Sequence, residues 1–357
     1  MKKNIVSLHG SYFFNNYGDI LLVNLFASWI CQACTNVEIN LPMANRAKIN
    51  ELPGEKNGLL NLLKSKALVF CGGGYFGEQP RHKLYWSLRN FYRHGIVGAL
   101  AIFFRIPYVI IGVEFGPISY SWFRRVVIWI AKNAKLVIVR NQESYDFLQK
   151  YGVKDVRLSY DAVLSLSKTI KPAVTDDSNP SILLHIPSYY LYKEQIRNLV
   201  ECVIDTIKSS QWNSCKLYLV SDDPYKPYDS EDCNTLISLL NKSGISYSIP
   251  DYTTYESLIQ LINESSYIFT TKLHVGITAA ALNKRVFSLY THPKTVRLHK
   301  QINNERFCMP ITSNVLEVKD RIKDFFSSDP YNIPLECVEL SDYNRRAVCE
   351  FITSIIK

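Results

Sequence analysis

The residues best suited to acid–base chemistry follow a short apolar run in the second half of the sequence. Tyr267 to Phe269 predicts a buried strand, and Thr270 to Gly276 follows it before a run of small residues that predicts a helix. This order places His274 at the carboxyl end of the strand and near the helix N-terminus, with Lys272 two residues earlier. Imidazole titrates near neutral pH, which suits proton transfer. A lone histidine is more often structural, but this position and the neighbouring lysine favour a catalytic His274.

A second group of cations follows the next predicted strand, Arg285 to Leu289. Lys294 comes soon after this strand, with Arg297 close behind. If the two strands lie in one parallel sheet, Lys294 reaches the same edge as His274. Clustered cations at such an edge can hold a small, multiply charged anion. The alternative for Lys294 is a solvated surface lysine.

Two charged residues end predicted strands in the first half of the chain. Arg140 follows Leu136 to Val139, where a guanidinium can bind a carboxylate or phosphate through two parallel hydrogen bonds. Its alternative role is an ion pair with a nearby acid such as Glu143. Glu114 follows Tyr108 to Val113, where a carboxylate can bind a hydroxyl group. The alternative for Glu114 is an acid in an exposed loop.

Two loops of the first half complete the candidate site. Ser11 to Asp19 lies between the first predicted strand and the first predicted helix, and its Asn16 and Asp19 can face a hydroxyl-rich or anionic ligand. For Asp19 the alternative is a plain helix cap. A glycine-rich segment follows the predicted strand Ala67 to Cys71, where it lets the backbone approach a ligand closely or simply makes a tight turn. Its glycines are Gly72, Gly73 and Gly74.

Short apolar strands alternate with helical patterns along the whole chain. This alternation predicts an α/β fold with mainly parallel sheets covered on both faces, in which ligands collect beyond the carboxyl ends of the strands. With 357 residues, two doubly wound, Rossmann-like domains facing across a cleft are expected. We predict an N-terminal domain over 1–167, a linker over 168–179, a C-terminal domain over 180–330, and a final helical segment, 331–357, that packs back on the first domain.

Composition restricts the classes of partner. The formal charge of +9 favours anionic partners, but the basic residues are dispersed and no DNA- or RNA-recognition motif is visible, so nucleic acid is not expected. The nine cysteines show no metal-ligand spacing, and we expect no metal and no cofactor. So many unpaired thiols suit a reducing cytoplasm. The N-terminus does not resemble a signal peptide, and Arg105 and Pro107 interrupt the apolar stretch from Gly95 to Val113.

Two stretches combine aromatic and basic residues. They are Lys83 to Arg93 and Ser121 to Lys132. Tyr and Trp beside Arg are typical of a membrane interface, which favours peripheral contact with the inner face of the cytoplasmic membrane. The alternative is a pair of ordinary amphipathic helices that face the core.

The order of these motifs resembles the polysaccharide pyruvyl transferases. The resemblance rests on Asn-Asn-Tyr-Gly-Asp after the first strand, the glycine triplet, the element around Arg140, Lys-Leu-His at 272–274 and the lysine at 294, and it extends from about Asn4 to Lys300. It implies a GT-B-like pair of domains that uses phosphoenolpyruvate as co-substrate. It also implies a product, a pyruvate ketal on a sugar of a bacterial capsule, exopolysaccharide or cell-wall precursor, which is expected to be lipid-linked.

The resemblance also implies roles for individual residues. His274 matches the family's catalytic histidine, Arg140 and Lys294 match donor-binding positions, and Lys272 stands where the family usually has arginine. Lysine keeps the charge there but loses the two-pronged hydrogen bonding of a guanidinium. The residues expected to face the acceptor sugar are Asn16, Asp19 and Glu114. Two other functions stay open, namely a glycosyltransferase that uses a nucleotide sugar and a carbohydrate-binding protein without catalysis.

Overall fold

The computed structural model describes residues 3–13, 16–44, 52–54, 56–79, 81–186, 192–210, 212, 214–221, 231–250 and 254–356. The chain divides into two compact units. Unit 1 comprises Met1–Val163 together with Glu339–Lys357, and unit 2 comprises Leu164–Val338. Unit 1 is therefore built from two separate stretches of chain, and unit 2 is inserted between them.

Unit 1 contains a seven-stranded sheet with the order β3-β2-β1-β4-β5-β6-β7, and every strand pair in it is parallel. Its strands are β1 (Asn4–His9), β2 (Val37–Leu41), β3 (Lys56–Asn57), β4 (Ala67–Phe76), β5 (Tyr108–Phe115), β6 (Val137–Val139) and β7 (Val156–Leu158). Its helical segments are α1 (Tyr17–Ala33), α2 (Leu59–Leu63), α3 (Lys83–Asn90), the π-helical η1 (Phe91–Gly95), α4 (Ile96–Phe103), α5 (Ser121–Asn133), α6 (Gln142–Lys150) and most of α13 (Leu335–Ile355).

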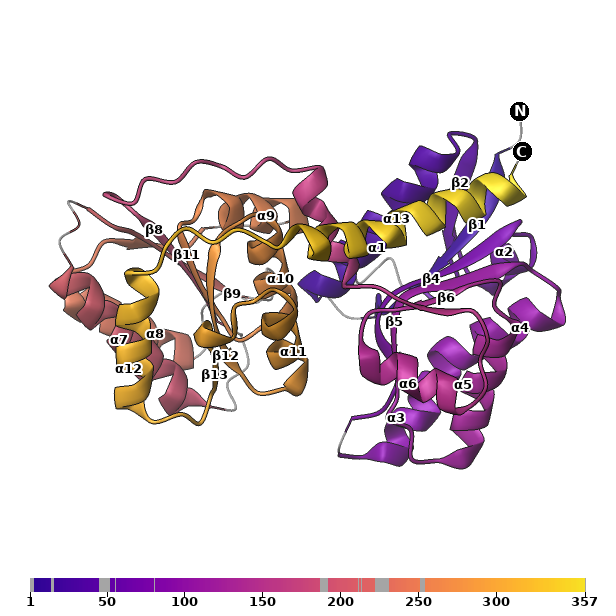
Figure 1. The fold of residues 1–357 in the computed structure, drawn as a ribbon, viewed down its shortest axis with the longest axis horizontal. Coiled ribbons are helices and arrows are strands. Elements are labelled where there is room, and N and C mark those ends of the chain that lie inside the picture. The colour runs from indigo at the N-terminus through magenta and orange to yellow at the C-terminus, as the bar shows by residue number, and fades with distance from the viewer. Residues whose placement is uncertain are drawn as a thin grey trace. The chain divides into compact units, whose positions relative to one another are not determined.

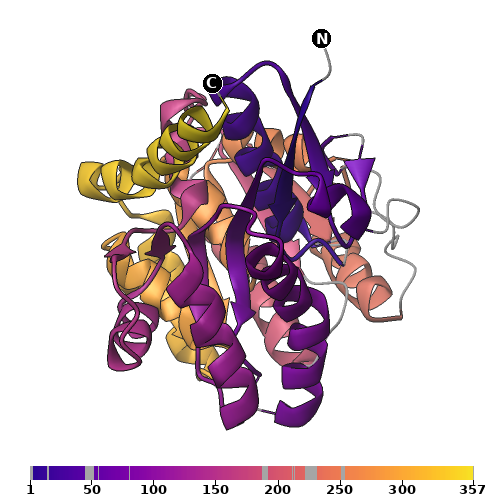
Figure 2. The same cartoon turned by 90° about the vertical axis from the view of Figure 1, so that its right-hand side faces the viewer.

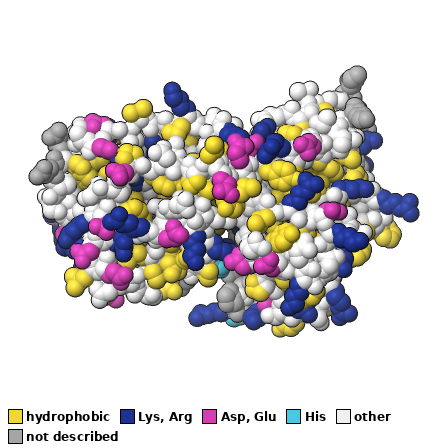
Figure 3. Space-filling view, viewed as in Figure 1, with side chains coloured by type: hydrophobic (Ala, Val, Ile, Leu, Met, Phe, Trp, Pro, Cys, Tyr) yellow, Lys and Arg dark blue, Asp and Glu magenta, His cyan; other side chains and the backbone are white. Residues whose placement is uncertain are grey.

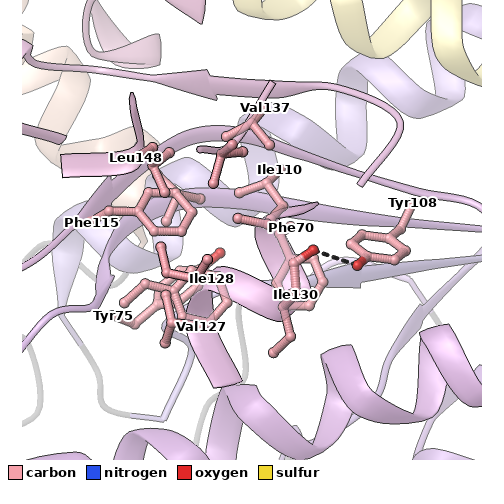
Figure 4. Packing of buried hydrophobic residues seen from close by; sticks show 14 of the residues in the cluster. Phe70, Tyr75, Tyr108, Ile110, Phe115, Val127, Ile128, Ile130, Val137 and Leu148 are labelled. Carbon is pink, nitrogen blue, oxygen red and sulfur yellow. Dashed lines mark hydrogen bonds between the residues drawn. The ribbon is translucent and has the colours of Figure 1, made fainter. Parts of the chain in front are cut away.

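Helices cover both faces of this sheet (Figures 1 and 2). On one face, α4 and α5 pack with the inward side chains of the central strands, such as Phe70 and Ile110, into the main core of the unit (Figure 4). Within this core, the Tyr108 hydroxyl donates a 2.6 Å hydrogen bond to the carbonyl of Ile130 on α5. The other face is covered by α1 and α13. Burial on both faces explains why these strands read as nearly continuous apolar runs.

The final helix belongs to unit 1 over most of its length. The Ser341 hydroxyl donates to the carbonyl of Asp161 at 2.7 Å, and the Asn344 amide donates to the carbonyl of Tyr160 at 2.9 Å. Val348 and Ile352 are fully buried in the same unit. The last helix therefore completes the core of the unit in which the chain began.

Unit 2 contains a six-stranded parallel sheet with the order β10-β9-β8-β11-β12-β13. Its strands are β8 (Ser181–Ile186), β9 (Lys216–Ser221), β10 (Tyr247–Ser248), β11 (Tyr267–Thr270), β12 (Arg285–Tyr290) and β13 (Cys308–Pro310). Its helical segments are η2 (Ala162–Lys168), α7 (Lys193–Ser209), α8 (Glu231–Ser243), α9 (Tyr255–Glu264), α10 (Leu273–Ala281), α11 (Pro293–Gln301), η3 (Glu305–Phe307) and α12 (Val315–Phe326). Phe269 and Phe287 belong to a core that includes side chains of α7, α8 and α12.

The segment predicted as a linker, 168–179, is hydrogen-bonded to strand β12 of unit 2 and the residue before it. Lys284 donates to the carbonyl of Ala173 at 2.6 Å, and burial lowers the pKa of this lysine to about 8. Arg285 donates to both carboxylate oxygens of Asp177, at 3.0 and 3.2 Å. The boundary between the units therefore falls near residue 163, ahead of this segment.

Two predicted strands extend further than expected. β4 continues beyond Cys71, through the glycines, to Phe76, and β5 continues to Phe115. Glu114 consequently lies within a buried strand and not in an exposed loop. The extension of β4 depends on Gly72 and Gly73, whose φ angles of 26° and 97° are rarely adopted by other residues. A side chain on Gly72 would also come within 2.8 Å of Leu22 on α1.

The predicted fold class is confirmed. Each unit is a doubly wound α/β structure around a parallel sheet, and both sheets share the 3-2-1-4-5-6 order that is typical of Rossmann-like folds. Within the described part of the chain, no helix is both long and apolar enough to cross a membrane.

Candidate active site

The order of strands in each sheet reverses at one place. In unit 1 this switch point lies between β1 and β4, and in unit 2 it lies between β8 and β11. Ligands of doubly wound folds bind beyond the carboxyl ends of the strands at such points. The predicted site residues follow these strands or their immediate neighbours.

In unit 2, His274 lies in the first turn of α10, directly after the switch-point strand β11. Lys272 is the N-cap residue of α10, and its backbone N–H donates to the Thr270 hydroxyl at 3.0 Å. The first turn of a helix presents backbone N–H groups and the positive end of the helix dipole. Both side chains are partly buried, so Lys272 and His274 stand at a point that favours a bound anion.

Lys294 occupies the equivalent position on the next strand and helix. β12 is hydrogen-bonded to β11, and α11 follows it with Pro293 at its first position. The His292 ring caps α11 by accepting a 3.3 Å hydrogen bond from the backbone N–H of Lys294. The N-terminal turns of α10 and α11 thus meet the same edge of the sheet. The predicted placement of Lys294 on the rim that carries His274 agrees with this strand pairing.

Two buried histidines contact residues of the strands that end at this edge, and neither is among the residues predicted for the site. His185, at the end of β8, lies 3.3 Å from the Thr270 hydroxyl that fixes the start of α10. His299 on α11 contacts the Ser288 hydroxyl and the carbonyl of Asn304, each at 2.9 Å. Burial lowers the pKa of His299 to about 4, so this ring is neutral at physiological pH. His185 stands near the end of β8, and His299 stands on the helix that follows β12. These positions next to strands are the sequence signal that could have identified them.

In unit 1, the structure joins Arg140 to Glu114 and to a third residue, Asp161, that was not predicted for the site. Arg140 is buried and donates to Glu114 at 3.0 Å and to Asp161 at 2.5 Å. Neither of these hydrogen bonds involves Glu143, the partner considered from the sequence. Burial alone would lower the pKa of Arg140, but Asp161 and Glu114 together raise it above its usual value. The guanidinium therefore stays charged.

This geometry does not favour the predicted role of Arg140 as a direct clamp on the donor. Both arms of the guanidinium already bind carboxylates. An incoming anion would have to displace Glu114 or Asp161, which is costly for buried charges. Arg140 instead holds Glu114 in one orientation at the carboxyl end of β5.

The residues predicted to face an acceptor lie around the start of α1. Asn16 caps this helix by accepting a 3.0 Å hydrogen bond from the N–H of Gly18, so the cap is Asn16 and not Asp19. Asp19 lies in the first turn. Phe14 and Asn15, in the same predicted loop, lie outside the described residues.

The charges of Asp19 and Arg140 both act on the buried phenol of Tyr75. Burial raises the pKa of Tyr75 well above its usual value, with smaller contributions from Cys71 and Tyr12. Arg140 opposes this shift and Asp19 adds to it. The start of α1 and the residue that follows β6 therefore both influence the pKa of this tyrosine of β4.

A buried pair of histidines lies beside Tyr75. The two rings of His9, at the end of β1, and His94, in η1, are joined by a 2.9 Å contact between Nε2 and Nδ1. The other nitrogen of His9 is 2.9 Å from the Tyr12 hydroxyl, and the His94 ring stacks on Tyr75. Burial lowers the pKa of His9 to about 3 and that of His94 well below its usual value. Both rings are therefore neutral at physiological pH.

Among the side chains that the structure describes, no group of three or more His, Cys, Asp or Glu residues is arranged to hold a metal ion. The groups that remain are cations, a histidine and helix N-termini in unit 2, with carboxylates and phenols in unit 1. The first set suits a small anion, and the second set suits hydroxyl groups.

Solved structures with similar folds include UDP-GlcNAc 2-epimerases. The enzyme from Neisseria meningitidis has a TM-score of 0.60 at 12% identity, with 98% of this chain and 100% of that chain covered. The enzyme from Methanocaldococcus jannaschii has a TM-score of 0.60 at 13% identity, with 97% and 99% covered. The enzyme from Rickettsia bellii has a TM-score of 0.57 at 10% identity, with 100% and 96% covered. At such low identity these likenesses concern the fold alone.

Sequence comparisons are more specific. No curated protein matches the chain. A family model described as polysaccharide pyruvyl transferase matches residues 16–293, which include every residue predicted for the site except Lys294, the position directly after the match. The match covers most of the chain and spans both units. The chain belongs to the polysaccharide pyruvyl transferase family.

Proposed function

We propose that this protein transfers the pyruvyl group of phosphoenolpyruvate to a sugar of a surface-polysaccharide precursor. The observation that carries this proposal is the meeting of Lys272, His274 and Lys294 at two neighbouring helix N-termini, in a member of this family. Phosphoenolpyruvate bears a carboxylate and a phosphate, and two cations beside two helix dipoles complement both groups. The donor therefore binds at the edge of the unit 2 sheet.

The proposed reaction forms two carbon–oxygen bonds at C2 of the donor and breaks one. A sugar hydroxyl adds to C2 while a proton reaches C3, so the methylene becomes a methyl group. A second hydroxyl of the same sugar then attacks C2, and phosphate leaves with the electrons of its C2–O bond. One hydroxyl proton is thus balanced by the proton on C3, and the other leaves with the phosphate. The product is a cyclic pyruvate ketal.

Each proposed role follows from the chemistry of its residue. His274 moves the proton that passes between the hydroxyl group and C3, and Lys272 and Lys294 neutralise the phosphate as its charge develops. Arg140 acts through Glu114, whose carboxylate accepts a hydrogen bond from an acceptor hydroxyl. Asn16, Asp19 and the glycines of β4 border the same acceptor. The acceptor itself is proposed to be lipid-linked.

The role of His274 is tested by phosphate release from phosphoenolpyruvate in the presence of a lipid-linked galactoside. Loss of a general acid–base group should lower kcat roughly 10²- to 10⁴-fold in His274→Gln. His82→Gln is a matched control, because His82 is an exposed histidine far along the sequence from the motif. Undiminished turnover in His274→Gln would remove this residue from the mechanism.

Donor binding is tested with two lysines of one helix. Lys294→Gln should raise the KM for phosphoenolpyruvate roughly 10- to 100-fold, because a charge-assisted hydrogen bond to an anion is lost. Lys300→Gln removes the same charge from the exposed far end of α11 and should leave the KM unchanged. Equal effects in the two variants would point to a general field effect and not to a built site.

The identity of the donor is tested by thermal shift. Phosphoenolpyruvate should raise the Tm of the protein, and the rise should disappear in Lys294→Gln. UDP-GlcNAc, the ligand named for two of the structural neighbours, is the comparison. A shift with UDP-GlcNAc and none with phosphoenolpyruvate would favour chemistry on a nucleotide sugar.

A further inference from the structure

The positive charge of the chain is concentrated in one stretch. Between Gln79 and Gln142 the sequence has ten Lys and Arg residues and one carboxylate, the buried Glu114. This stretch carries a formal charge of +9, which equals that of the whole chain, so the remaining residues balance to zero. Apart from the adjacent Arg124 and Arg125, the cations are spaced singly and therefore look dispersed in the sequence, although the net charge is local.

The same stretch exposes large apolar side chains. α3, η1 and α4 follow one another without a break from Lys83 to Phe103, since Asn90, Phe91, Gly95 and Ile96 all keep right-handed helical angles. One side of this helix buries Ser87, His94, Val97 and Ala101. The other side exposes Tyr85 by 61%, Leu88 by 53%, Tyr92 by 62% and Phe103 by 80%. Their spacing of three or four residues around Leu88 puts the first three on one helical face.

Cations border this apolar face at both ends. Arg81 and Lys83 are exposed where the helix begins, and Arg105 is exposed just after it ends. The neighbouring helix α5 packs against η1 and α4 and presents a stripe at positions i, i+4 and i+7 that consists of Arg125, Trp129 and Lys132. Figure 3 shows Lys and Arg side chains interspersed with hydrophobic ones over this part of unit 1. We call the surface formed by α3, η1, α4 and the outer stripe of α5 the basic aromatic face.

We propose that the basic aromatic face docks on an anionic lipid bilayer. A helix with an apolar face, flanking cations and no acidic residues lies in the plane of a membrane interface, where Tyr and Trp are favoured and lysine and arginine reach the phosphates. Leu88, Phe103 and Phe104 are exposed to water in the free protein, and burial in the acyl boundary removes this apolar surface from water. Each cation near an anionic surface strengthens binding on the order of fivefold.

Other occupants fit the surface less well. Single-stranded nucleic acid also binds cations and aromatic rings, but it follows a positively charged groove in which bases stack. Here the aromatic rings stand on the outer side of a helix, together with the aliphatic Leu84 and Leu88. The helices of this face contain no acidic residue. A second copy of the chain could therefore pair with its cations only through acidic residues from another part of its surface. The inference does not depend on the proposed transferase activity.

The test is flotation of the purified full chain with lipid vesicles at low and physiological salt. Binding is expected to vesicles of phosphatidylcholine mixed with phosphatidylglycerol, to weaken with salt, and to be much weaker on phosphatidylcholine alone. The triple variant Arg81→Gln/Lys83→Gln/Arg105→Gln should bind the anionic vesicles roughly a hundred-fold more weakly, because three cations are lost. The double variant Tyr92→Ser/Phe103→Ser should bind more weakly at every salt concentration.

Matched controls lie in unit 2. Lys208→Gln/Lys216→Gln/Lys242→Gln removes the same charge from exposed positions elsewhere, and Leu316→Ser removes a leucine that is 72% exposed. Both should bind like the unmodified chain. Equal loss in the controls, or equal binding to neutral and anionic vesicles, would overturn the proposal. Binding of single-stranded RNA without binding of vesicles, or a dimer that Phe103→Ser dissociates, would assign the face to another partner.

Discussion

Arg140 is the residue whose surroundings differ most from a sequence-based expectation. A guanidinium at the end of a buried strand looks available for an anionic ligand, yet Arg140 binds the protein's own Glu114 and Asp161. Both carboxylates are buried with it. Removing the cation alone would take the ion pair with Arg140 away from both buried carboxylates.

We therefore expect Arg140→Met to destabilise the protein by about 3–5 kcal/mol, the usual cost of breaking a buried ion pair from one side. The triple variant Glu114→Gln/Arg140→Met/Asp161→Asn removes all three charges and should recover much of this loss. Urea denaturation followed by circular dichroism measures both. If the triple variant regains stability and pyruvyl transfer together, Glu114 has no role in acceptor binding.

The partners of Arg140 could not be read from the sequence. Glu114 and Asp161 are 26 and 21 residues away along the chain, and only the pairing of β5, β6 and β7 brings them together. Lys272, His274 and Lys294 were easier to predict, because each follows a recognisable strand by a few residues. Local spacing thus identifies a strand end, whereas long-range pairing decides what a side chain at that end contacts.

The buried pair His9 and His94 makes the stability of unit 1 sensitive to acid. Burial lowers the pKa of His9 from 6.5 to about 3, so His9 stays neutral in the folded chain while the unfolded chain gains a proton below about pH 6.5. The stability that this neutral ring contributes is complete above pH 6.5 and is lost as the pH falls toward 3. The pKa of His94 is lowered in the same direction.

We expect His9→Gln to flatten the pH dependence of stability. Between about pH 4 and 6, one proton fewer bound on unfolding lowers the slope by about 1.4 kcal/mol per pH unit. The measurement is the free energy of unfolding in urea at several pH values for both proteins. Comparing slopes cancels the carboxylates that both proteins share. Parallel slopes would mean that His9 is protonated alike in the folded and unfolded chains.

At the scale of elements, the three glycines of strand β4 lie inside the strand and do not end it. Three consecutive glycines predicted the end of a strand, but the strand passes through them because Gly72 and Gly73 adopt positive φ angles while pairing with β5 continues. Gly72 also lets α1 approach the sheet, since a side chain there would meet Leu22. The glycines therefore shape the backbone of the sheet at the switch point of unit 1.

Gly72→Ala should destabilise the protein more than Gly244→Ala does. Both residues have positive φ angles, but a side chain on Gly244 would meet nothing within 4 Å. A positive φ angle strains a side chain at both positions, and the clash with Leu22 adds about 1–3 kcal/mol to the cost at Gly72. Thermal unfolding of the two variants measures the difference. Adding Leu22→Ala to Gly72→Ala should relieve the clash, and no relief would place the strain in the backbone alone.

At the scale of the whole molecule, unit 2 is continuous in sequence and unit 1 is not. A fragment of residues 164–338 should therefore unfold cooperatively by itself. A fragment of residues 1–163 lacks the buried Val348 and Ile352 of α13 and should fold poorly. Joining 339–357 to that fragment through a flexible linker should restore cooperative unfolding. Thermal melts followed by circular dichroism decide, and a cooperative transition in 1–163 alone would contradict the prediction.

The two-part construction of unit 1 also sets an order on the ribosome. The strands of its sheet and helix α1 are translated first, yet α13, which covers the same face as α1, is completed only after all of unit 2 has been made. Domains usually fold in the order of synthesis. Here unit 2 can finish folding first, because part of the apolar surface of unit 1 stays exposed until α13 has been made. A ribosome that stalls within unit 2 would release a chain with that surface uncovered, which cellular quality control can recognise.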